Sequence, residues 1–135
     1  MREIKFRAWH KEQEKMYSAE EMGRDQLTLM PDGRGFANIS GKDTGLSRID
    51  DGRRMIPLQY TGLKDSKGQE IYEGDKIHTG GLDCVVVWNQ NTCSFRLTRA
   101  GKQTRIPQDT PLDINHIPQL EVIGNIWETP ALVKA

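Results

Sequence analysis

Between residues 55 and 127, short runs of β-branched and aromatic side chains alternate with turn residues, and this spacing constrains the fold more than any other feature. Gly, Pro, Asn and Asp separate the runs. Segments this short and this regularly spaced are typical of a small β-barrel or sandwich. We expect strands at 55–63, 70–72, 76–79, 84–88, 94–99, 104–107 and 121–127.

The stretch 60–77, "YTGLKDSKGQEIYEGDKI", predicts two tight turns inside this pattern. In "KDSKGQE", Gly68 is free to take a positive φ, and the Asp65 side chain can accept hydrogen bonds from the turn amides. Gly74 marks a second bend in "YEGDKI". The Gly-Asp-x-Ile pattern before a strand is typical of SH3-like barrels, in which the carboxylate, here that of Asp75, holds a corner.

The acidic residues of this stretch do not fit a calcium loop. Such a loop needs oxygen ligands at its first and third positions. Counted from Asp65 the third position is Lys67, and counted from Asp75 it is Ile77. A catalytic carboxylate pair, which general acid–base chemistry requires, is a minor alternative, drawn from Asp65, Glu70, Glu73 and Asp75.

The N-terminal part of the chain predicts a β-rich extension over residues 1–54. Alternation of Ile4, Phe6 and Ala8 with polar neighbours indicates a half-buried strand. Ser18 followed by Glu21 fits a capping box and predicts a short helix at 18–25. We also expect a hairpin of 27–30 with 36–39, a polar loop at 40–54, and a barrel over 55–135 that ends in a short tail.

Charge and hydropathy exclude several classes of protein. Lys plus Arg and Asp plus Glu number 19 each, so the chain has no overall attraction to nucleic acid or to a membrane surface. No apolar run approaches the roughly 20 residues of a membrane span. The charged start "MREIKFRAWHKE" has no apolar signal-peptide core. We therefore expect a cytoplasmic protein.

The two cysteines are expected to be free thiols in the core. In "CVVVWNQNTCSFRL" a turn centred on Gln90 and Asn91 would place Trp88 opposite Cys93 and Cys84 opposite Leu97. The cysteines would then lie roughly 13 Å apart along the sheet, beyond the ~7 Å Cα separation that a disulfide tolerates. This register also predicts that Trp88 lies in the core with Val86 and Phe95.

Metal and protease signatures are weak. His10, His78 and His116, even with Cys84 and Cys93, contain no ligand pair at the two-to-four-residue spacing of zinc sites. The "DTG" at Asp43 resembles an aspartic-protease loop but follows polar residues where an apolar strand is required. We expect no metal, no cofactor and no catalytic residues.

Two groups of residues are candidates for binding. The first is aromatic and consists of Trp9, Tyr60 and Tyr72, which would line a groove for a protein partner beside an open strand edge. For Trp9, packing against the second part of the chain is the competing interpretation. The second is the basic, acid-free hairpin 94–105, which would contact nucleic acid through Arg96, Arg99, Lys102 and Arg105.

Three separated signatures, "IKFRAW" at 4–9, "LQYTGLKDSKGQEIYEGDKI" at 58–77 and "VIGNIWETPAL" at 122–132, resemble the YopX family of phage and prophage proteins. The resemblance implies an SH3-type barrel with extra N-terminal elements, and a phage or prophage gene expressed in the cytoplasm of a bacterial host. It brings no assigned activity and no catalytic residue.

The sequence therefore predicts a mainly β protein, an SH3-like small barrel with a β-rich N-terminal extension. The expected function is a non-enzymatic accessory protein that binds a host or phage protein. The alternative is a small nucleic-acid-binding protein, and association with a second copy of the chain stays open.

Overall fold

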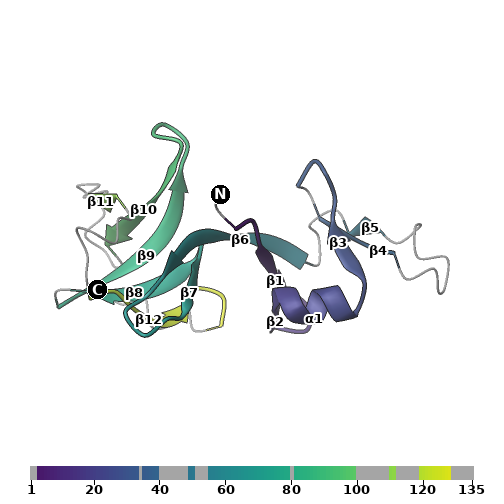
Figure 1. Cartoon of the computed structure of the whole chain (residues 1–135), viewed down its shortest axis with the longest axis horizontal. Coiled ribbons are helices and arrows are strands. Elements are labelled where there is room, and N and C mark those ends of the chain that lie inside the picture. The colour runs from purple at the N-terminus through teal and green to yellow at the C-terminus, as the bar shows by residue number, and fades with distance from the viewer. Residues whose placement is uncertain are drawn as a thin grey trace. The chain divides into compact units, whose positions relative to one another are not determined.

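The computed structural model divides into two compact units. They are an N-terminal unit, Ile4–Gln59, and a C-terminal unit, Tyr60–Ala135 with Met1–Glu3. The division falls within one strand, a few residues beyond the boundary expected from composition (Figure 1). The structure describes residues 3–33, 35–39, 49–50, 55–79, 81–99, 110–111 and 119–128.

In the N-terminal unit, a strand pair leads into a capped helix. β1 (Phe6–His10) pairs antiparallel with β2 (Lys15–Tyr17). α1 (Ala19–Arg24) begins at the predicted capping box: the Ser18 hydroxyl accepts the Glu21 N–H at 3.1 Å, and the Glu21 carboxylate accepts the Ser18 N–H at 3.2 Å. Because this exchange satisfies amides that the first helical turn leaves unpaired, so short a helix can form here.

A second, three-stranded sheet completes this unit in the order β3-β4-β5. β3 (Leu27–Leu29) and β4 (Phe36–Asn38) form the predicted hairpin. β5 (Ile49–Asp50) pairs with β4, so the prediction of a loop throughout 40–54 is wrong at these two residues; 40–48 and 51–54 lie outside the described residues. The buried core of the unit consists of Ala8, Met22, Phe36 and Met55.

β6 (Met55–Lys64) is the longest described strand and has two partners in succession. Its first half, Met55–Gln59, pairs with β1, and beyond it Tyr60 and Lys64 pair with β7 (Glu70–Tyr72). The register shifts between Tyr60 and Lys64, where Gly62 has a positive φ of 91°. A single strand thus contributes to both units.

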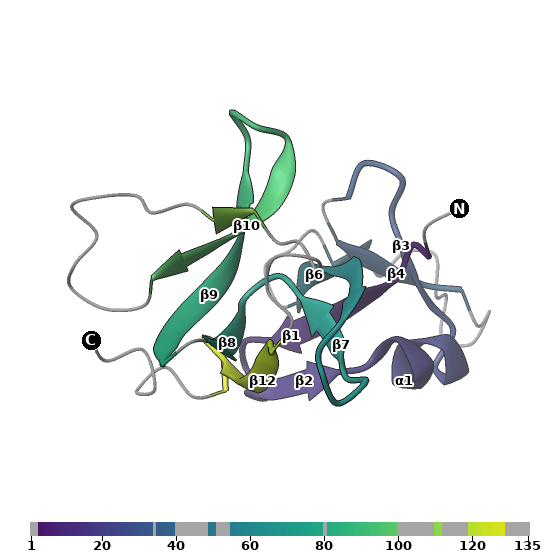
Figure 2. The same ribbon diagram turned by 60° about the vertical axis from the view of Figure 1, so that its left-hand side comes forward.

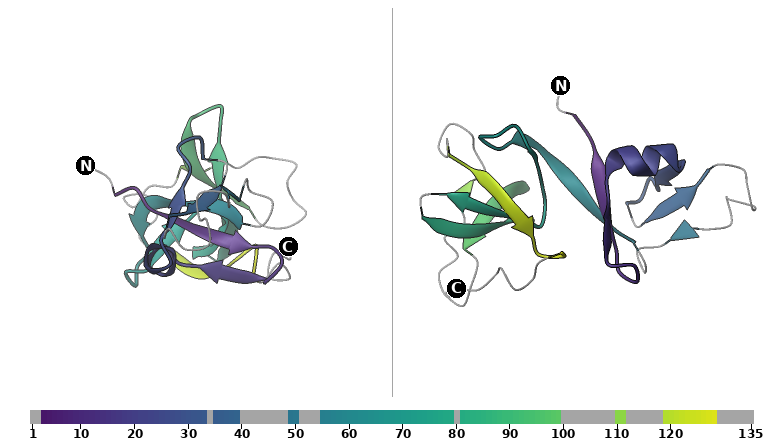
Figure 3. Two further views of the ribbon diagram at one scale, coloured as in Figure 1. Left: turned by 90° about the vertical axis from the view of Figure 1, so that its right-hand side faces the viewer. Right: turned by 90° about the horizontal axis from the view of Figure 1, so that it is seen from below.

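The C-terminal unit contains a curled antiparallel sheet in the order β11-β10-β9-β8-β12 (Figures 1 and 2). Consecutive hairpins link β8, β9 and β10, whereas β12 returns to pair with β8, as Figure 3 shows. The strands are β8 (Asp75–Thr79), β9 (Leu82–Asn89), β10 (Ser94–Arg99), β11 (Thr110–Pro111) and β12 (Glu121–Asn125).

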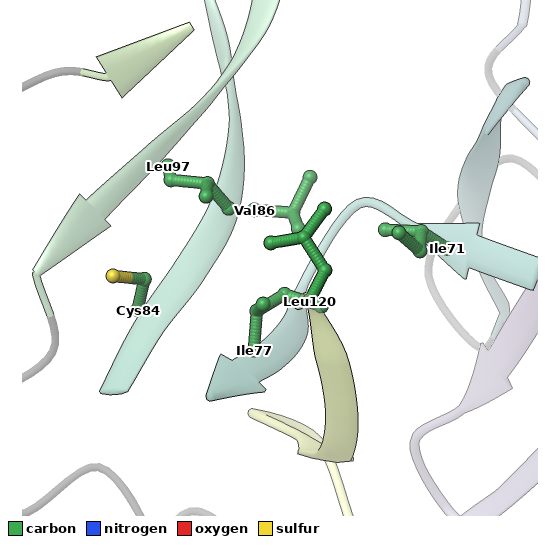
Figure 4. Packing of buried hydrophobic residues seen from close by; sticks show 6 residues of the cluster. All are labelled: Ile71, Ile77, Cys84, Val86, Leu97 and Leu120. Atoms are coloured by element: carbon green, nitrogen blue, oxygen red, sulfur yellow. The ribbon is translucent and has the colours of Figure 1, made fainter. Parts of the chain in front are cut away.

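The core of this unit lies against one face of the sheet. Alternation along β9 and β10 directs Val86 and Leu97, which are paired in the register, to the same side, where they are 1% and 2% exposed. Figure 4 shows how side chains from different strands gather there. The buried set is Ile71, Ile77, Cys84, Val86, Leu97 and Leu120.

The mainly β, barrel-like fold predicted from the sequence is confirmed, with the curled sheet forming a half-barrel. The predicted limits of β7 and β10 are those observed; the strand expected at 104–107 lies outside the described residues. None of the helices in the described part of the chain has the length and apolar character needed to cross a membrane.

Candidate protein-binding surface

The loop between β9 and β10 has four residues, not the two expected. Asn89 pairs with Ser94, and the Asn89 side-chain oxygen accepts the N–H groups of Asn91 and Thr92 at 2.9 and 3.1 Å. Cys93 closes the loop with a φ of +52°. A two-residue hairpin turn needs residues that tolerate positive φ at one or both central positions. Gln90-Asn91 contains no glycine to meet this need. In the four-residue loop only Cys93 has a positive φ.

The longer loop moves the register by two residues and changes the environment of Trp88. Trp88 pairs with Phe95, not with Cys93, and Val86 pairs with Leu97, not with Phe95. Trp88 is 48% exposed, so the prediction that it lies in the core is wrong. The face was predicted correctly, because Val86 and Trp88 do lie on the same side of β9, but Trp88 is next to the loop, beyond the buried part of that face.

Trp88 and Phe95 form an edge-to-face pair at the end of the hairpin. Their ring centroids are 5.1 Å apart and their planes are inclined at 72°. Phe95 is half-buried and packs against the core cluster of the C-terminal unit. Its ring also contacts the exposed indole of Trp88. The hairpin projects from the sheet in Figures 1 and 2. The apolar face of the sheet therefore continues from a buried region into solvent.

The three aromatic residues predicted to line a groove lie in the core instead. Trp9 is buried in β1, which agrees with the packing interpretation given for it. Tyr60 and Tyr72 pair across β6 and β7 with ring centroids 5.4 Å apart, and both are buried. Rings this far from solvent offer a partner almost no surface.

The predicted basic residues are only partly within the described structure. Arg96 is half-buried on β10 and pairs with Val87. The strand position of Arg99 pairs with Cys84; because side chains alternate along a strand, positions 96 and 99 belong to opposite faces of β10. Lys102 and Arg105 lie outside the described residues. The two described positions thus do not form one basic face.

The stretch 60–77 forms the turns that its sequence predicts. Gly68 and Gly74 have φ values of 84° and 85°. The Asp65 Oδ1 atom accepts the N–H groups of Lys67 and Gln69 at 2.9 and 2.8 Å. At the second bend the Asp75 Oδ2 atom accepts the Tyr72 N–H at 2.8 Å. Both aspartates are buried and bind the backbone, which is the structural role expected for them.

A third hydrogen bond to the backbone connects Asp65, and with it the turn at 65–69, to β12. Its Oδ2 atom accepts the N–H of Val122 in β12 at 3.0 Å. Burial opposes ionisation of the Asp65 carboxyl, but the hydrogen bonds from Val122, Gln69 and Lys67 favour the carboxylate, and the net effect lowers its pKa. Nothing in the local sequence of the turn indicates the bond to β12.

Two of the three family-like signatures meet at the second bend. Asp75 pairs with Asn125, and the Gly74 carbonyl accepts the Ile126 N–H at 3.0 Å. The Trp127 indole lies so close to Gly74 that a Cβ built on this glycine would be 2.8 Å from the indole nitrogen. The polar groups that meet here hold the fold, so we do not assign them a catalytic role.

The burial of Lys76 was not predicted. It lies in β8 between Val85 and Gly124, and only 1% of it is exposed. Burial lowers the pKa of its ammonium, and the Asp83 carboxylate acts in the opposite direction.

The histidines and cysteines are dispersed. His78 Nδ1 lies 2.8 Å from the Asp83 carboxylate, and His10 Nδ1 accepts the Gln13 N–H at 3.1 Å.

Cys84 is buried and Cys93 is exposed, and both are free thiols. The prediction of a core environment is therefore wrong for Cys93. Across the described residues, no group of three His, Cys, Asp or Glu side chains could hold a metal ion. His116 and Asp43 lie outside them.

The fold and this surface define a small, mainly β protein with an aromatic pair on a projecting hairpin. The YopX family profile, described as "YopX protein", matches residues 5–134. The chain belongs to the YopX family, as its three signatures indicated.

Among solved structures, the chain resembles protein EF1440 from Enterococcus faecalis, with a TM-score of 0.63 and 20% sequence identity. The match covers 99% of this chain and 100% of that one. At this identity the similarity shows a shared fold. No curated protein matches the chain at a significant level.

Proposed function

We propose that this protein is a non-enzymatic binding module that docks a partner protein on the Trp88–Phe95 pair at the end of the β9–β10 hairpin. The observation that carries the proposal is the exposure of Trp88, 48% of whose surface meets solvent although it is paired with Phe95 in the β9–β10 ladder. The proposed context is a phage or prophage accessory protein in the cytoplasm of a bacterial host, as the family resemblance implies.

An exposed tryptophan in this setting suits protein recognition. Tryptophan is enriched among the residues that dominate binding energy at interfaces, because it buries a large apolar area and carries one hydrogen-bond donor. The edge-to-face contact with Phe95 limits the freedom of the indole before binding. The Trp88 side chain therefore loses less conformational entropy when a partner binds.

The carboxylates of 60–77 support a non-enzymatic role. Asp65 and Asp75 are buried and accept bonds from backbone N–H groups. Glu70 Oε1 accepts the Tyr72 hydroxyl at 3.2 Å. General acid–base catalysis needs a carboxyl that can reach a substrate proton, and carboxylates committed to the backbone in the core are poorly suited to that task.

The test is affinity capture from the lysate of a bacterium that carries a YopX-family gene, after nuclease treatment. The full-length chain, Trp88→Ala and Ile39→Ala are compared. Ile39 is the matched control because it is also a large, exposed apolar residue, at 54%, but lies in the N-terminal unit. We expect a stoichiometric protein that Trp88→Ala loses and Ile39→Ala retains. Equal recovery by both variants would reject the hairpin as the docking surface.

The alternative function is binding of nucleic acid, and one observation favours it: the hairpin joins an exposed aromatic ring to a basic residue, Arg96. Binding to nucleic acid should depend strongly on salt, because phosphate contacts weaken steeply with ionic strength. Capture that disappears after nuclease treatment would support this alternative.

A further inference from the structure

The end of the β9–β10 hairpin is uncharged. Residues 84–95 contain no Asp, Glu, Lys, Arg or His, and this is the longest such stretch of a chain in which 28% of the residues are charged. Arg96 follows it, but Arg96 pairs with Val87 and lies on the opposite face of the hairpin from Trp88. The surface that residues 88–95 provide therefore consists of aromatic, amide, hydroxyl and thiol groups alone.

Hydrogen bonds inside the loop fix the shape of this surface. The Asn89 Oδ1 atom accepts the N–H groups of Asn91 and Thr92. The hydroxyl oxygens of Thr92 and Ser94 lie 2.9 Å apart, within hydrogen-bond distance. Because the loop already holds its own backbone, a partner that binds here has little loop ordering to provide.

Two exposed side-chain amides, those of Gln90 and Asn91, lie in the loop directly beyond the aromatic pair. Each amide has two N–H donors and an oxygen acceptor, which match the peptide groups and amide side chains of another protein. Aromatic rings combined with Asn and Ser are also typical of antibody paratopes, in which the rings supply contact area and the polar groups adapt their hydrogen bonds. A charged group of a partner would lose water here and gain no ion pair from residues 88–95.

A membrane and a nucleic acid fit this surface less well than a protein does. Residues 89–92 lie beyond Trp88 at the end of the hairpin, so a bilayer would have to take up their amide and hydroxyl groups before the indole. Polar groups that lose water without a hydrogen-bond partner are costly to bury. Contacts with phosphates need cations, and residues 84–95 contain none.

We propose that the partner presents an uncharged protein segment, which places an apolar side chain against the Trp88–Phe95 pair and forms hydrogen bonds with the amides of Gln90 and Asn91. This inference rests on the proposed function, because it names the partner class for the same surface. The site consists of residues 88–95, and its contacts are apolar and amide contacts that salt does not screen.

The test uses three immobilised peptide libraries of one design, about ten residues long with a fixed central leucine. The flanking positions are random among Asn, Gln, Ser and Gly in the first library, Asp, Glu and Gly in the second, and Lys, Arg and Gly in the third. Single-stranded oligothymidine and phosphatidylcholine vesicles are two further probes. Binding of the full-length protein is measured at low salt, ~50 mM, and at high salt, ~500 mM.

We expect the tightest peptides of the neutral library to bind about tenfold more tightly than those of either charged library. This binding should change by less than about twofold between the two salt concentrations. Trp88→Ala should weaken it about tenfold or more. Asn91→Asp and Asn91→Lys should both weaken it, by about threefold or more, because each introduces a charge that must lose water in the contact.

The controls are Ile39→Ala, Thr28→Asp and Thr28→Lys, which change an exposed apolar and an exposed polar side chain of the N-terminal unit. Their binding should stay within about twofold of that of the unchanged protein. Thermal unfolding confirms that each variant is folded, and Trp88→Gln replaces Trp88→Ala if that variant is not.

Two kinds of result separate this inference from the proposed function. Binding that needs Trp88 but is as tight for a charged library, weakens severalfold with salt, or is strengthened by either Asn91 variant overturns the uncharged partner and leaves the docking surface intact. If no library shows binding that needs Trp88, or if oligothymidine or the vesicles bind through Trp88 more tightly than every peptide, both fall.

Discussion

The Oδ2 atom of Asp65 accepts a hydrogen bond of 3.0 Å from the backbone N–H of Val122, 57 positions further along the chain. Ser66 strengthens the same link, because its backbone N–H and its hydroxyl both donate to the Leu120 carbonyl at 2.9 Å. The turn at 65–69 thus holds the start of β12, and the buried Asp65 side chain supports both structures at once.

Replacing Asp65 with Asn should destabilise the protein by about 1.5–3 kcal/mol, the range for hydrogen bonds to a charged group. The amide can present an oxygen either to Lys67 and Gln69 or to Val122, but not to both sides. Urea unfolding measures the loss. Glu12→Gln is the control, since Glu12 is exposed, and should change stability by less than about 0.5 kcal/mol. Equal effects of the two substitutions would contradict the role of Asp65.

The contribution of Asp65 should also depend on pH. Because the pKa of this carboxyl is lower in the folded protein than the ordinary value of 3.8, the carboxylate stabilises the fold above pH 3.8, and this stabilisation is lost as the pH falls through the folded-state pKa. The difference in unfolding free energy between the wild type and Asp65→Asn should be constant above about pH 5 and should shrink below pH 3.8. A difference that does not change down to about pH 2 would show that ionisation of Asp65 is not involved.

Gly74→Ala should cost more than Gly68→Ala, although the two glycines have nearly the same φ, 85° and 84°. At Gly68 nothing lies within 4 Å of an added Cβ, so only backbone strain remains, about 1–2 kcal/mol. At Gly74 the Cβ would lie 2.8 Å from the Trp127 indole nitrogen, which should add about 1–3 kcal/mol of overpacking. Equal midpoints of thermal unfolding would show that the indole moves away without cost.

Thiol titration should find one reactive cysteine in the native protein and two after unfolding. Cys93 is exposed in the hairpin loop, whereas Cys84 is buried in the core. Only an accessible thiolate reacts quickly with a disulfide reagent. Cys93→Ser should abolish the native reaction and leave one thiol that reacts in denaturant. Rapid reaction of two thiols in the folded wild type would contradict the burial of Cys84.

Trp88→Ala should cost much less stability than Leu97→Ala. Leu97 is 2% exposed, and truncating a core leucine costs about 2–5 kcal/mol. Trp88 already meets solvent, so its removal forfeits little more than the contact with Phe95, about 0.5–1.5 kcal/mol. Urea unfolding of both variants decides the point, and a larger loss for Trp88→Ala would mean that the indole supports the core.

Local chemistry explains what could be predicted from the sequence. The capping box at Ser18 and Glu21, and the turns at Gly68 and Gly74, depend on residues a few positions apart, and their geometry is as expected. The position of Trp88 could not be predicted as well, because period-2 alternation gives the face of a strand but not how far along the sheet that face stays covered. The loop length also decides the register, and here Cys93, which is not a glycine, takes the positive φ.

Other features depend on pairing between distant segments. The third hydrogen bond of Asp65 requires β12, and the burial of Lys76 follows from its place between β9 and β12. The local sequence around Asp65 predicts only its bonds to the turn amides, and the local sequence around Lys76 does not distinguish it from an ordinary surface charge. The family resemblance indicated which segments matter, but not that 74–75 and 125–127 lie together.

β6 also has a consequence for how this protein can be rearranged in evolution. Since its residues 55–59 pair with β1 while Tyr60 and Lys64 pair with β7, a recombination joint placed inside the strand would leave each half of the gene encoding a sheet with an unmatched edge. Shuffling of either unit should therefore preserve 55–64 whole, and hybrid genes should join outside this strand.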